Sequence, residues 1–252
     1  MKTKGTLLVV IGVLTAAVFH RPAAVASAPG TTRGIIDAEN LTRPAEARQL
    51  VGETGHVLVP ESDGPCRWTF AEGVLTASPG WDSVITREAY RDFRMHLEFN
   101  VNDDPAAEPG MNGNSGVYIQ GRYEVQILNS YGVAAADYTA SDCGSLYRMK
   151  KPDQIVNRPA GEWQSFDIVF RAARFAGDKK IENARLTAYQ NGQLIHDDVA
   201  IPRHTGAGKK EGPDPQPIKL QGHHNPVRFR NVWIQPLDLD ETSVASEPPS
   251  GG

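Results

Sequence analysis

The sequence predicts an all-β protein, an antiparallel β-sandwich of the jelly-roll kind. Short runs of alternating apolar and polar residues recur along most of the chain, and no long amphipathic helix is evident. The 252 residues include 24 glycines and 18 prolines, a composition that suits many short strands joined by turns. No repeat of fixed period is visible, which argues against a propeller or a solenoid.

The first half of the chain supplies the first group of expected strands. Segment 68–79, WTFAEGVLTASP, offers two short runs around a Glu72-Gly73 turn. Segment 93–101, FRMHLEFNV, alternates cleanly and sends its large apolar side chains to one face. A loop over 102–116 is dense in Asn, Gly and Pro, and two more strand runs follow on either side of Gly121.

The second half resumes the strand pattern after a long irregular stretch at 133–158. Segment 162–175, EWQSFDIVFRAARF, reads as a strand. In segment 184–199, the Asn191-Gly192 pair fits the type I′ turn of a β-hairpin. Residues 217–237 then close the domain.

The two ends of the chain differ from this pattern. Lys2 and Lys4 precede an apolar run of about 13 residues, and small residues follow at alternate positions, which is the layout of a secretory signal peptide. The run is shorter than the roughly 20 residues that span a bilayer, so a retained anchor is the alternative. We expect a signal peptide at 1–28, a linker at 29–50, the β-sandwich at 51–238 and a disordered tail at 239–252, with the mature protein secreted or periplasmic.

The charge balance limits the expected binding partners, and the two cysteines raise the question of a disulfide. With 26 Lys and Arg against 30 Asp and Glu, the chain offers no excess of positive charge for nucleic acid or a membrane surface, so neither partner is expected. The oligomeric state is left open. In an oxidising compartment Cys66 and Cys143 are predicted to form a disulfide, and two separate buried thiols are the alternative.

The strand in RYEVQILNSYG, residues 122–132, carries the most informative polar face. Val125 and Ile127 point one way, whereas Arg122, Glu124 and Gln126 point the other. Sandwich glucanases that retain configuration carry three acids spaced E-x-D-x-x-E on such a strand. Here that spacing gives Glu124 followed by two amides, and an amide can neither attack an anomeric carbon nor protonate a leaving group. Conventional two-carboxylate glycoside hydrolysis therefore loses support.

Six segments occur in the order seen in one bacterial family. They are YRDFRMHLEF, NSGVYIQGRYEVQILNSYG, CGSLYRMKKP, GEWQSFDIVFRAARF, YQNGQLIHDD and LQGHHNPVRFRNVWI. Over Val51 to Leu237 the chain resembles the 3-keto-disaccharide hydrolase domain family, also described as 3-keto-glucoside 1,2-lyase and 3-keto-2-hydroxyglucal hydratase. The resemblance implies a concanavalin A-like sandwich and an oxidised sugar as the substrate.

The resemblance also implies a reaction that needs one base. A ketone at carbon 3 acidifies the proton on carbon 2, whose removal lets the group on carbon 1 leave by β-elimination, after which water adds back. We expect Glu124 and His223 to share the proton transfers. The family often has an acid where Asn129 stands and often Asp where Gly222 stands, so the activity of this member depends on whether those carboxylates matter.

Other side chains are expected to bind the substrate. The predicted set is Arg122, Gln126, Tyr118, Gln120, Lys150, Tyr147 and Trp163, chosen as donors to sugar oxygens or as aromatic surfaces for a sugar ring. No metal-binding spacing is present, and the alternative is a divalent cation held by His223 and a carboxylate. A carbohydrate-binding module without catalysis is the alternative function, because this fold is shared by many lectins.

Overall fold

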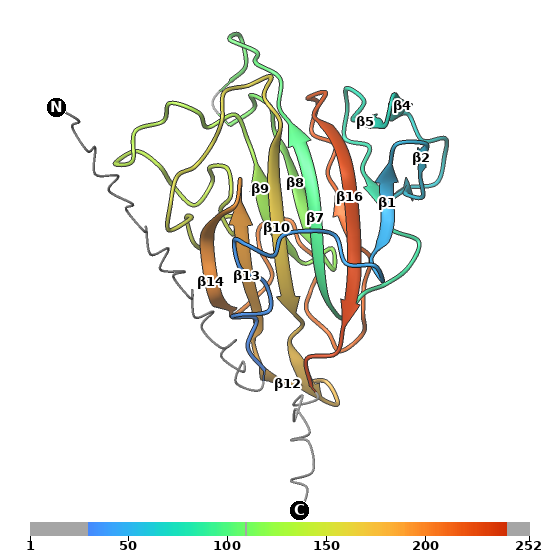
Figure 1. Ribbon diagram of the computed structural model, residues 1–252, viewed down its shortest axis with the longest axis vertical. Helices are drawn as coiled ribbons and strands as arrows, with labels where there is room; N and C mark the ends of the chain where they lie inside the picture. Colours follow the sequence, from blue (N-terminus) through green and yellow to red (C-terminus); the bar gives the residue numbers. More distant parts are fainter. Residues whose placement is uncertain (1–29, 109, 241–252) are drawn as a thin grey trace, which may run out of the picture.

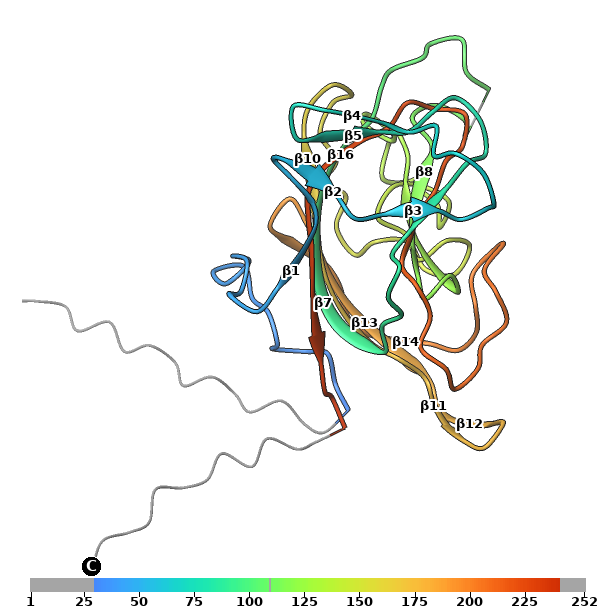
Figure 2. The same ribbon diagram turned by 90° about the vertical axis from the view of Figure 1, so that its right-hand side faces the viewer.

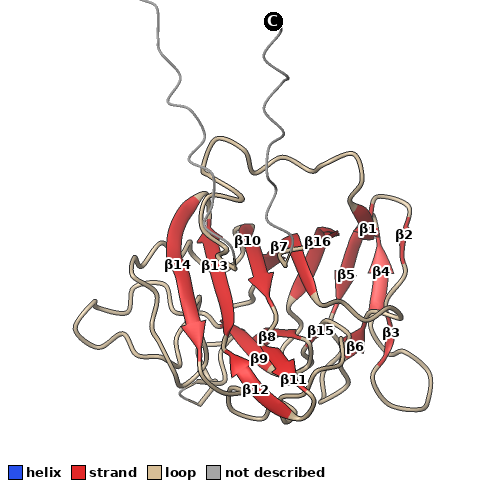
Figure 3. Ribbon diagram, turned by 90° about the horizontal axis from the view of Figure 1, so that it is seen from below, coloured by secondary structure: helices blue, strands red, loops and turns tan. Residues whose placement is uncertain are grey.

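The computed structural model describes residues 30–108 and 110–240, and two sheets pack face to face in it (Figures 1 and 2). Within these ranges the structure consists of strands and loops without a helix (Figure 3). No segment of the two ranges forms a helix long and apolar enough to cross a bilayer. The predicted antiparallel β-sandwich is confirmed.

The larger sheet has nine strands. Its main path is β14-β13-β10-β7-β16-β1-β2, and β5 pairs with β16 and carries β4 beside it. The strands are β1 (Arg48–Gly52), β2 (Gly55–His56), β4 (Thr69–Ala71), β5 (Val74–Thr76), β7 (Asp92–Asn100), β10 (Gln164–Arg171), β13 (Ala184–Gln190), β14 (Gln193–Ile201) and β16 (Arg228–Leu237).

The smaller sheet has five strands in the order β3-β6-β15-β8-β9. They are β3 (Val59–Pro60), β6 (Val84–Ile85), β8 (Ser115–Ile119), β9 (Tyr123–Ile127) and β15 (Lys219–Leu220). A separate ribbon pairs β11 (Arg174–Ala176) with β12 (Lys179–Glu182).

The core lies between the two sheets and follows the alternation in the sequence. On β7 the side chains of Phe93, Met95, Leu97 and Phe99 are fully buried in it. Apolar side chains from β8 and β9 meet them from the other layer. Each such burial removes apolar surface from water and contributes roughly 1.5–3 kcal/mol. The polar residues between these positions must therefore face outward from each sheet.

Two predicted turns are confirmed by the backbone. Asn191 and Gly192 have φ of 52° and 78° between β13 and β14, as a type I′ turn requires. Glu72 and Gly73 likewise have positive φ, 52° and 76°, between β4 and β5.

The segment before β1 is packed against the sheet. The N–H and the hydroxyl of Thr32 both donate to the Asp198 carboxylate, and the buried Ile36 packs with Val169 and Tyr189 on the outer face of the larger sheet. The described part of the expected linker therefore includes residues that contact the larger sheet. These contacts depend on single residues without periodicity, so the sequence pattern gave no sign of them.

The terminal predictions fall largely beyond the described part of the chain. The expected signal peptide at 1–28 lies outside the described residues, as does most of the expected tail. The sandwich itself begins with β1 at Arg48, three residues before the predicted boundary.

The predicted disulfide is wrong. Cys66 and Cys143 are both free; Cys66 is exposed and Cys143 is fully buried. The Cys143 sulfur packs in the core and accepts a long hydrogen bond of 3.7 Å from the Gln190 amide. An even number of cysteines indicates nothing about their separation, which the fold decides here.

Native-state thiol labelling should distinguish the two cysteines. We expect an aromatic disulfide reagent to modify Cys66 at once and Cys143 only after unfolding, because burial raises the pKa of the Cys143 thiol to about 12 and shields it from the reagent. The measurement is the number of protein thiols that react per chain, before and after denaturant is added to unreduced protein. One thiol followed by two is expected, and none in either condition would contradict the structure.

Candidate active site

The smaller sheet exposes a polar face on the side away from the core. Its register sets Tyr118 opposite Glu124, Gly116 opposite Gln126 and Lys219 opposite Tyr118. Since neighbouring residues on a strand point to opposite faces, the alternation that buries Val117 in the core brings these polar side chains together outside it.

A pocket of about 190 Å³ lies over this face. The residues that line it come from the β8–β9 hairpin, from the loop after β9, and from loops near residues 81, 114, 207 and 222. They are Trp81, Asn114, Tyr118, Glu124, Gln126, Tyr147, Ala207, Gln221 and His223. Glu124 is the one carboxylate in this set, so the pocket lacks the pair of acids used by conventional glycosidases.

Glu124 is almost completely buried, with 3% of its surface exposed. Its backbone N–H donates to the Thr205 hydroxyl at 2.7 Å. Burial raises the pKa of the Glu124 carboxyl to about 7, and the hydrogen bond from Tyr118 and the charge of Lys219 oppose that rise. Its Oε2 has no hydrogen-bond partner within the protein. A carboxyl that titrates near neutrality with one free oxygen suits a general base.

Glycine is required beside this carboxylate. A Cβ at Gly116 would lie 2.6 Å from Glu124 Oε1, so a larger residue there would displace the acid. Across the pocket, a Cβ at Gly206 would lie 2.7 Å from Cδ1 of Tyr147. Both glycines leave room for side chains that line the pocket.

Tyr118 lies beside the carboxylate on the neighbouring strand β8, and Lys219 lies next to Tyr118 on β15. Burial first, and then the nearby Glu124 charge, raise the pKa of Tyr118 well above its ordinary value, so the phenol keeps its proton. The Lys219 ammonium lies 4.3 Å from the centre of the Tyr118 ring and 3.3 Å from the Glu61 carboxylate. The pair supplies one neutral donor and one cation close to the acid.

Gln126 adds an amide on the other side of Glu124. With its nitrogen turned toward the acid, it donates to the Ser115 carbonyl at 2.9 Å and to Glu124 Oε1 at 3.3 Å. This hydrogen bond occupies Oε1, so Oε2 is the carboxylate oxygen without a hydrogen-bond partner in the protein.

His223 and Trp81 form the opposite wall. The imidazole lies edge-on to the indole, with ring centres 4.4 Å apart, and its Nδ1 has no hydrogen-bond partner within the protein. Burial, and then the charge of His224, lower the pKa of His223 against the opposing effect of a backbone hydrogen bond, so the ring is neutral at pH 7. Trp81 is 62% exposed and offers a flat apolar surface at the mouth of the pocket.

The structure brings together five of the nine residues predicted as catalytic or substrate-binding. Glu124, His223, Gln126, Tyr118 and Tyr147 all line the pocket.

The other four lie elsewhere. Arg122 donates to Gln120 at 3.0 Å, and Gln120 in turn donates to the Tyr90 carbonyl. Lys150 pairs with Asp153. Trp163 packs against Arg230 on the outer face of the larger sheet.

Arg122 was misplaced because β9 begins after it. Gln120 and Gly121 both have positive φ, which turns the chain before the strand and breaks the alternation on which its assignment depended. Lys219 and Gln221 were missed. The alternation of polar and apolar residues in IKLQ is visible in the sequence, but the sequence does not indicate that β15 pairs with β8.

The two departures from the family pattern do not line the pocket. Asn129 donates to the Asp103 carboxylate at 3.1 Å. At Gly222 a Cβ would lie 2.0 Å from the Asp82 carbonyl oxygen, so this backbone excludes an aspartate. The pocket is therefore built without a carboxylate at either position.

Among the described residues no group of three or more His, Cys, Asp or Glu side chains could hold a metal ion.

Comparison with solved structures gives similar proteins that align with most of this chain. A candidate glycosyl hydrolase from Parabacteroides distasonis ATCC 8503 is 30% identical, with a TM-score of 0.70, over 78% of this chain and 86% of that one. A second candidate glycosyl hydrolase from the same organism is 23% identical with a TM-score of 0.52, over 76% of this chain and 99% of that one, and supports the fold alone.

No curated protein sequence matches the chain. The sequence profile of the 3-keto-alpha-glucoside-1,2-lyase-like domain matches residues 49–235, about three quarters of the chain and nearly the whole sandwich. Together with the candidate glycosyl hydrolase, this match supports a carbohydrate-active function. The chain belongs to the 3-keto-alpha-glucoside-1,2-lyase-like domain family.

Proposed function

We propose that the protein cleaves 3-keto-glycosides by elimination and hydration at the Glu124 pocket. The observation that carries the proposal is a single buried carboxyl whose pKa is raised to about 7, with an unpartnered oxygen, in a pocket without a second acid. The family to which the chain belongs agrees with this chemistry.

The reaction balances with one base and one water. The base removes the proton from carbon 2, and the electron pair forms an enolate with the ketone at carbon 3. The enolate collapses to a carbon 1–carbon 2 double bond, the carbon 1–oxygen bond breaks, and the departing oxygen takes a proton. Water then adds to carbon 1 and a proton returns to carbon 2, giving a 3-keto sugar and the free alcohol.

The residues divide this work by their protonation states. Glu124 removes the carbon 2 proton, and the neutral His223 donates its ring N–H proton to the departing oxygen while its other ring nitrogen takes a proton from water. The protonated Tyr118 and the nearby Lys219 stabilise the developing enolate charge. Trp81 stacks on the apolar face of a sugar ring.

The pH profile should report the base. Because Glu124 must be ionised to act, we expect kcat/KM to rise with pH along a single ionisation near pH 7 and then level off. Initial rates across pH 5 to 9, on one 3-keto-disaccharide, give the curve. A rate that falls through this range would assign Glu124 as an acid and contradict the proposal.

Matched substrates test the activity itself. Oxidised and unoxidised forms of one disaccharide are incubated with the protein and the products are separated. Cleavage of the oxidised form alone is expected. Saturable binding without cleavage of either form would support a carbohydrate-binding module, and cleavage of the unoxidised form would support a conventional glycosidase.

The proposal places this activity outside the cytoplasm, after removal of residues 1–28, on the pattern of charged, apolar and small residues in the leader. An oxidised sugar is the partner proposed, and neither nucleic acid nor stable membrane association is part of the proposal.

A further inference from the structure

A second cavity lies on the opposite side of the sandwich. It measures about 760 Å³ and lies over β1, β7 and β16, beside the turns that follow β1 and β4. Glu98 lines it because this residue alternates on β7 with Leu97 and Phe99, which face the core. The cavity shares no lining residue with the Glu124 pocket, so the two cannot hold parts of one small substrate.

Beneath this cavity, the regular pairing of β1 with β16 and of β16 with β7 is interrupted. The β1–β16 register shifts between Gln49 and Val51, and the β16–β7 register shifts between Arg230 and Trp233. Asn231 takes a left-handed φ of 46° within the second irregularity. The Gln49 amide donates to the carbonyls of Val51 and Val232. Irregularities of this kind redirect side chains and recur beside functional sites.

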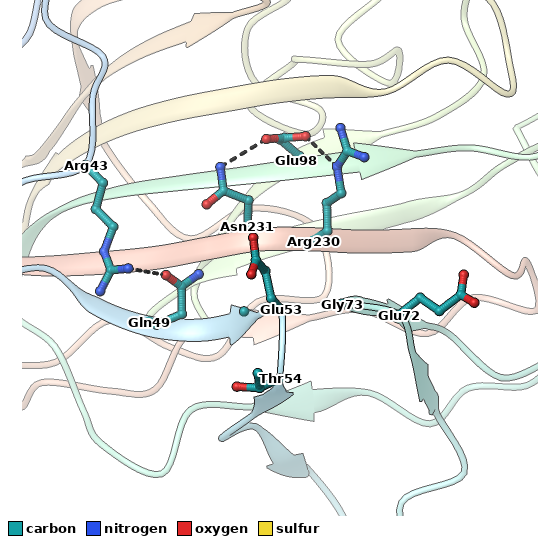
Figure 4. Close-up of a pocket in the computed structure, with 10 residues that line it drawn as sticks. Arg43, Gln49, Glu53, Thr54, Glu72, Gly73, Glu98, Arg230 and Asn231 are labelled. Atoms are coloured by element: carbon teal, nitrogen blue, oxygen red, sulfur yellow. Dashed lines mark hydrogen bonds and ion pairs between the residues drawn. The ribbon is translucent and has the colours of Figure 1, made fainter.

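The redirected side chains form a network of planar polar groups (Figure 4). The Glu98 carboxylate accepts hydrogen bonds from Arg230 Nε at 2.7 Å and from Asn231 Nδ2 at 3.0 Å. On the other side, Arg43 donates to the Gln49 side chain. It also donates to the Ala47 carbonyl. Arg230 is paired with the Glu98 carboxylate, whereas Arg43 donates to neutral oxygens. The lining also includes the carboxylates of Glu53 and Glu72, so its acids outnumber its guanidinium groups, which disfavours a phosphate.

An adjoining cavity lengthens this site into a groove. It measures about 210 Å³, shares Glu98 and Arg230 with the larger cavity, and adds Trp163 and Asn191 to the lining. The Arg230 guanidinium lies 4.0 Å from the centre of the Trp163 ring and so fixes both groups at the junction. We name the two cavities together the outer groove.

We propose that the outer groove binds a neutral oligosaccharide. The larger cavity has the size of a ligand pocket, roughly 300–1,000 Å³. Its lining is poor in apolar side chains, which argues against a lipid or an apolar peptide. Amides, a carboxylate and guanidinium groups held in fixed planes can exchange paired hydrogen bonds with sugar hydroxyls.

Tryptophan side-chain resonances give a direct test. Trp163 lies in the outer groove and Trp81 in the Glu124 pocket, so the two indole N–H signals report the two sites separately in one spectrum. Nitrogen-15-labelled protein is titrated with maltotriose and with cellotriose, two unoxidised neutral trisaccharides. A saturable shift of the Trp163 signal with at least one of them is expected.

Variants then tie the shift to the groove. Asn231→Gly keeps the left-handed backbone and removes the amide, and Glu98→Gln removes the charge that holds Arg230. Each should weaken the interaction by about tenfold. Lys179→Ala, an exposed change on β12, is the control and should leave the titration unchanged.

Three outcomes would overturn the proposal. They are the absence of a saturable Trp163 shift with both sugars, a shift confined to Trp81, and a Trp163 shift that survives both groove variants. None of them bears on cleavage of 3-keto-glycosides at the Glu124 pocket.

Discussion

Replacing Glu124 with Gln should slow cleavage of a 3-keto-glycoside by about 10² to 10⁴. The amide keeps the shape of the carboxyl and its contacts with Tyr118 and Gln126, but it cannot remove a proton from carbon 2. Substrate binding should change much less, because an amide still exchanges hydrogen bonds with sugar hydroxyls. Single-turnover rates with enzyme in excess separate the chemical step from binding.

Gln126→Glu is an informative companion to this variant. It leaves Glu124 in place and adds a like charge beside it, which should raise the pKa of Glu124 further and move the rate profile to higher pH. If Glu124→Gln instead retains the wild-type rate, Glu124 is not the base and His223 becomes the leading candidate.

Glu124→Gln should also stabilise the fold above neutral pH. In the unfolded chain the Glu124 carboxyl has a pKa of 4.5, whereas burial raises it to about 7 in the folded protein. Below pH 4.5 both states hold the proton. As pH rises from 4.5 to 7 the unfolded state loses its proton first, so wild-type stability falls, by about 3 kcal/mol at completion. Glutamine does not titrate and avoids this loss.

Unfolding in urea at pH 4.5, 6 and 8 measures this effect. The free energy of unfolding of Glu124→Gln relative to wild type should increase by about 3 kcal/mol between the first pH and the last. Glu162→Gln is the matched control, because it makes the same Glu-to-Gln change at an exposed position. A difference in the free energy of unfolding that stays constant with pH for Glu124→Gln would show that burial does not raise the pKa of the Glu124 carboxyl.

Alternation carried most of the fold prediction. On β7 and β9 the sequence pattern alone separates core residues from outward residues, and it correctly placed Glu124 and Gln126 on the polar face with Tyr118. The Asn-Gly turn was equally readable, because positive φ at both positions restricts the residue choice.

The remaining parts depend on contacts distant in sequence. Lys219 reaches the site only because β15 lies beside β8, about 100 residues away in the chain. Cys66 and Cys143 were paired by counting, yet the fold leaves one exposed and the other buried. The outer groove arises from irregularities in the pairing of β1 and β16, which no local sequence pattern predicts.

Exchange of the carbon 2 proton with deuterated water tests the central claim most directly. The substrate is a 3-keto-disaccharide, the protein is present in catalytic amount, and deuterium at carbon 2 of the recovered 3-keto sugar is measured by NMR. Wild type should incorporate deuterium during cleavage, and Glu124→Gln should lose incorporation and cleavage together. Cleavage by wild type without deuterium at carbon 2 would show that the bond breaks without proton removal there, and would contradict the account.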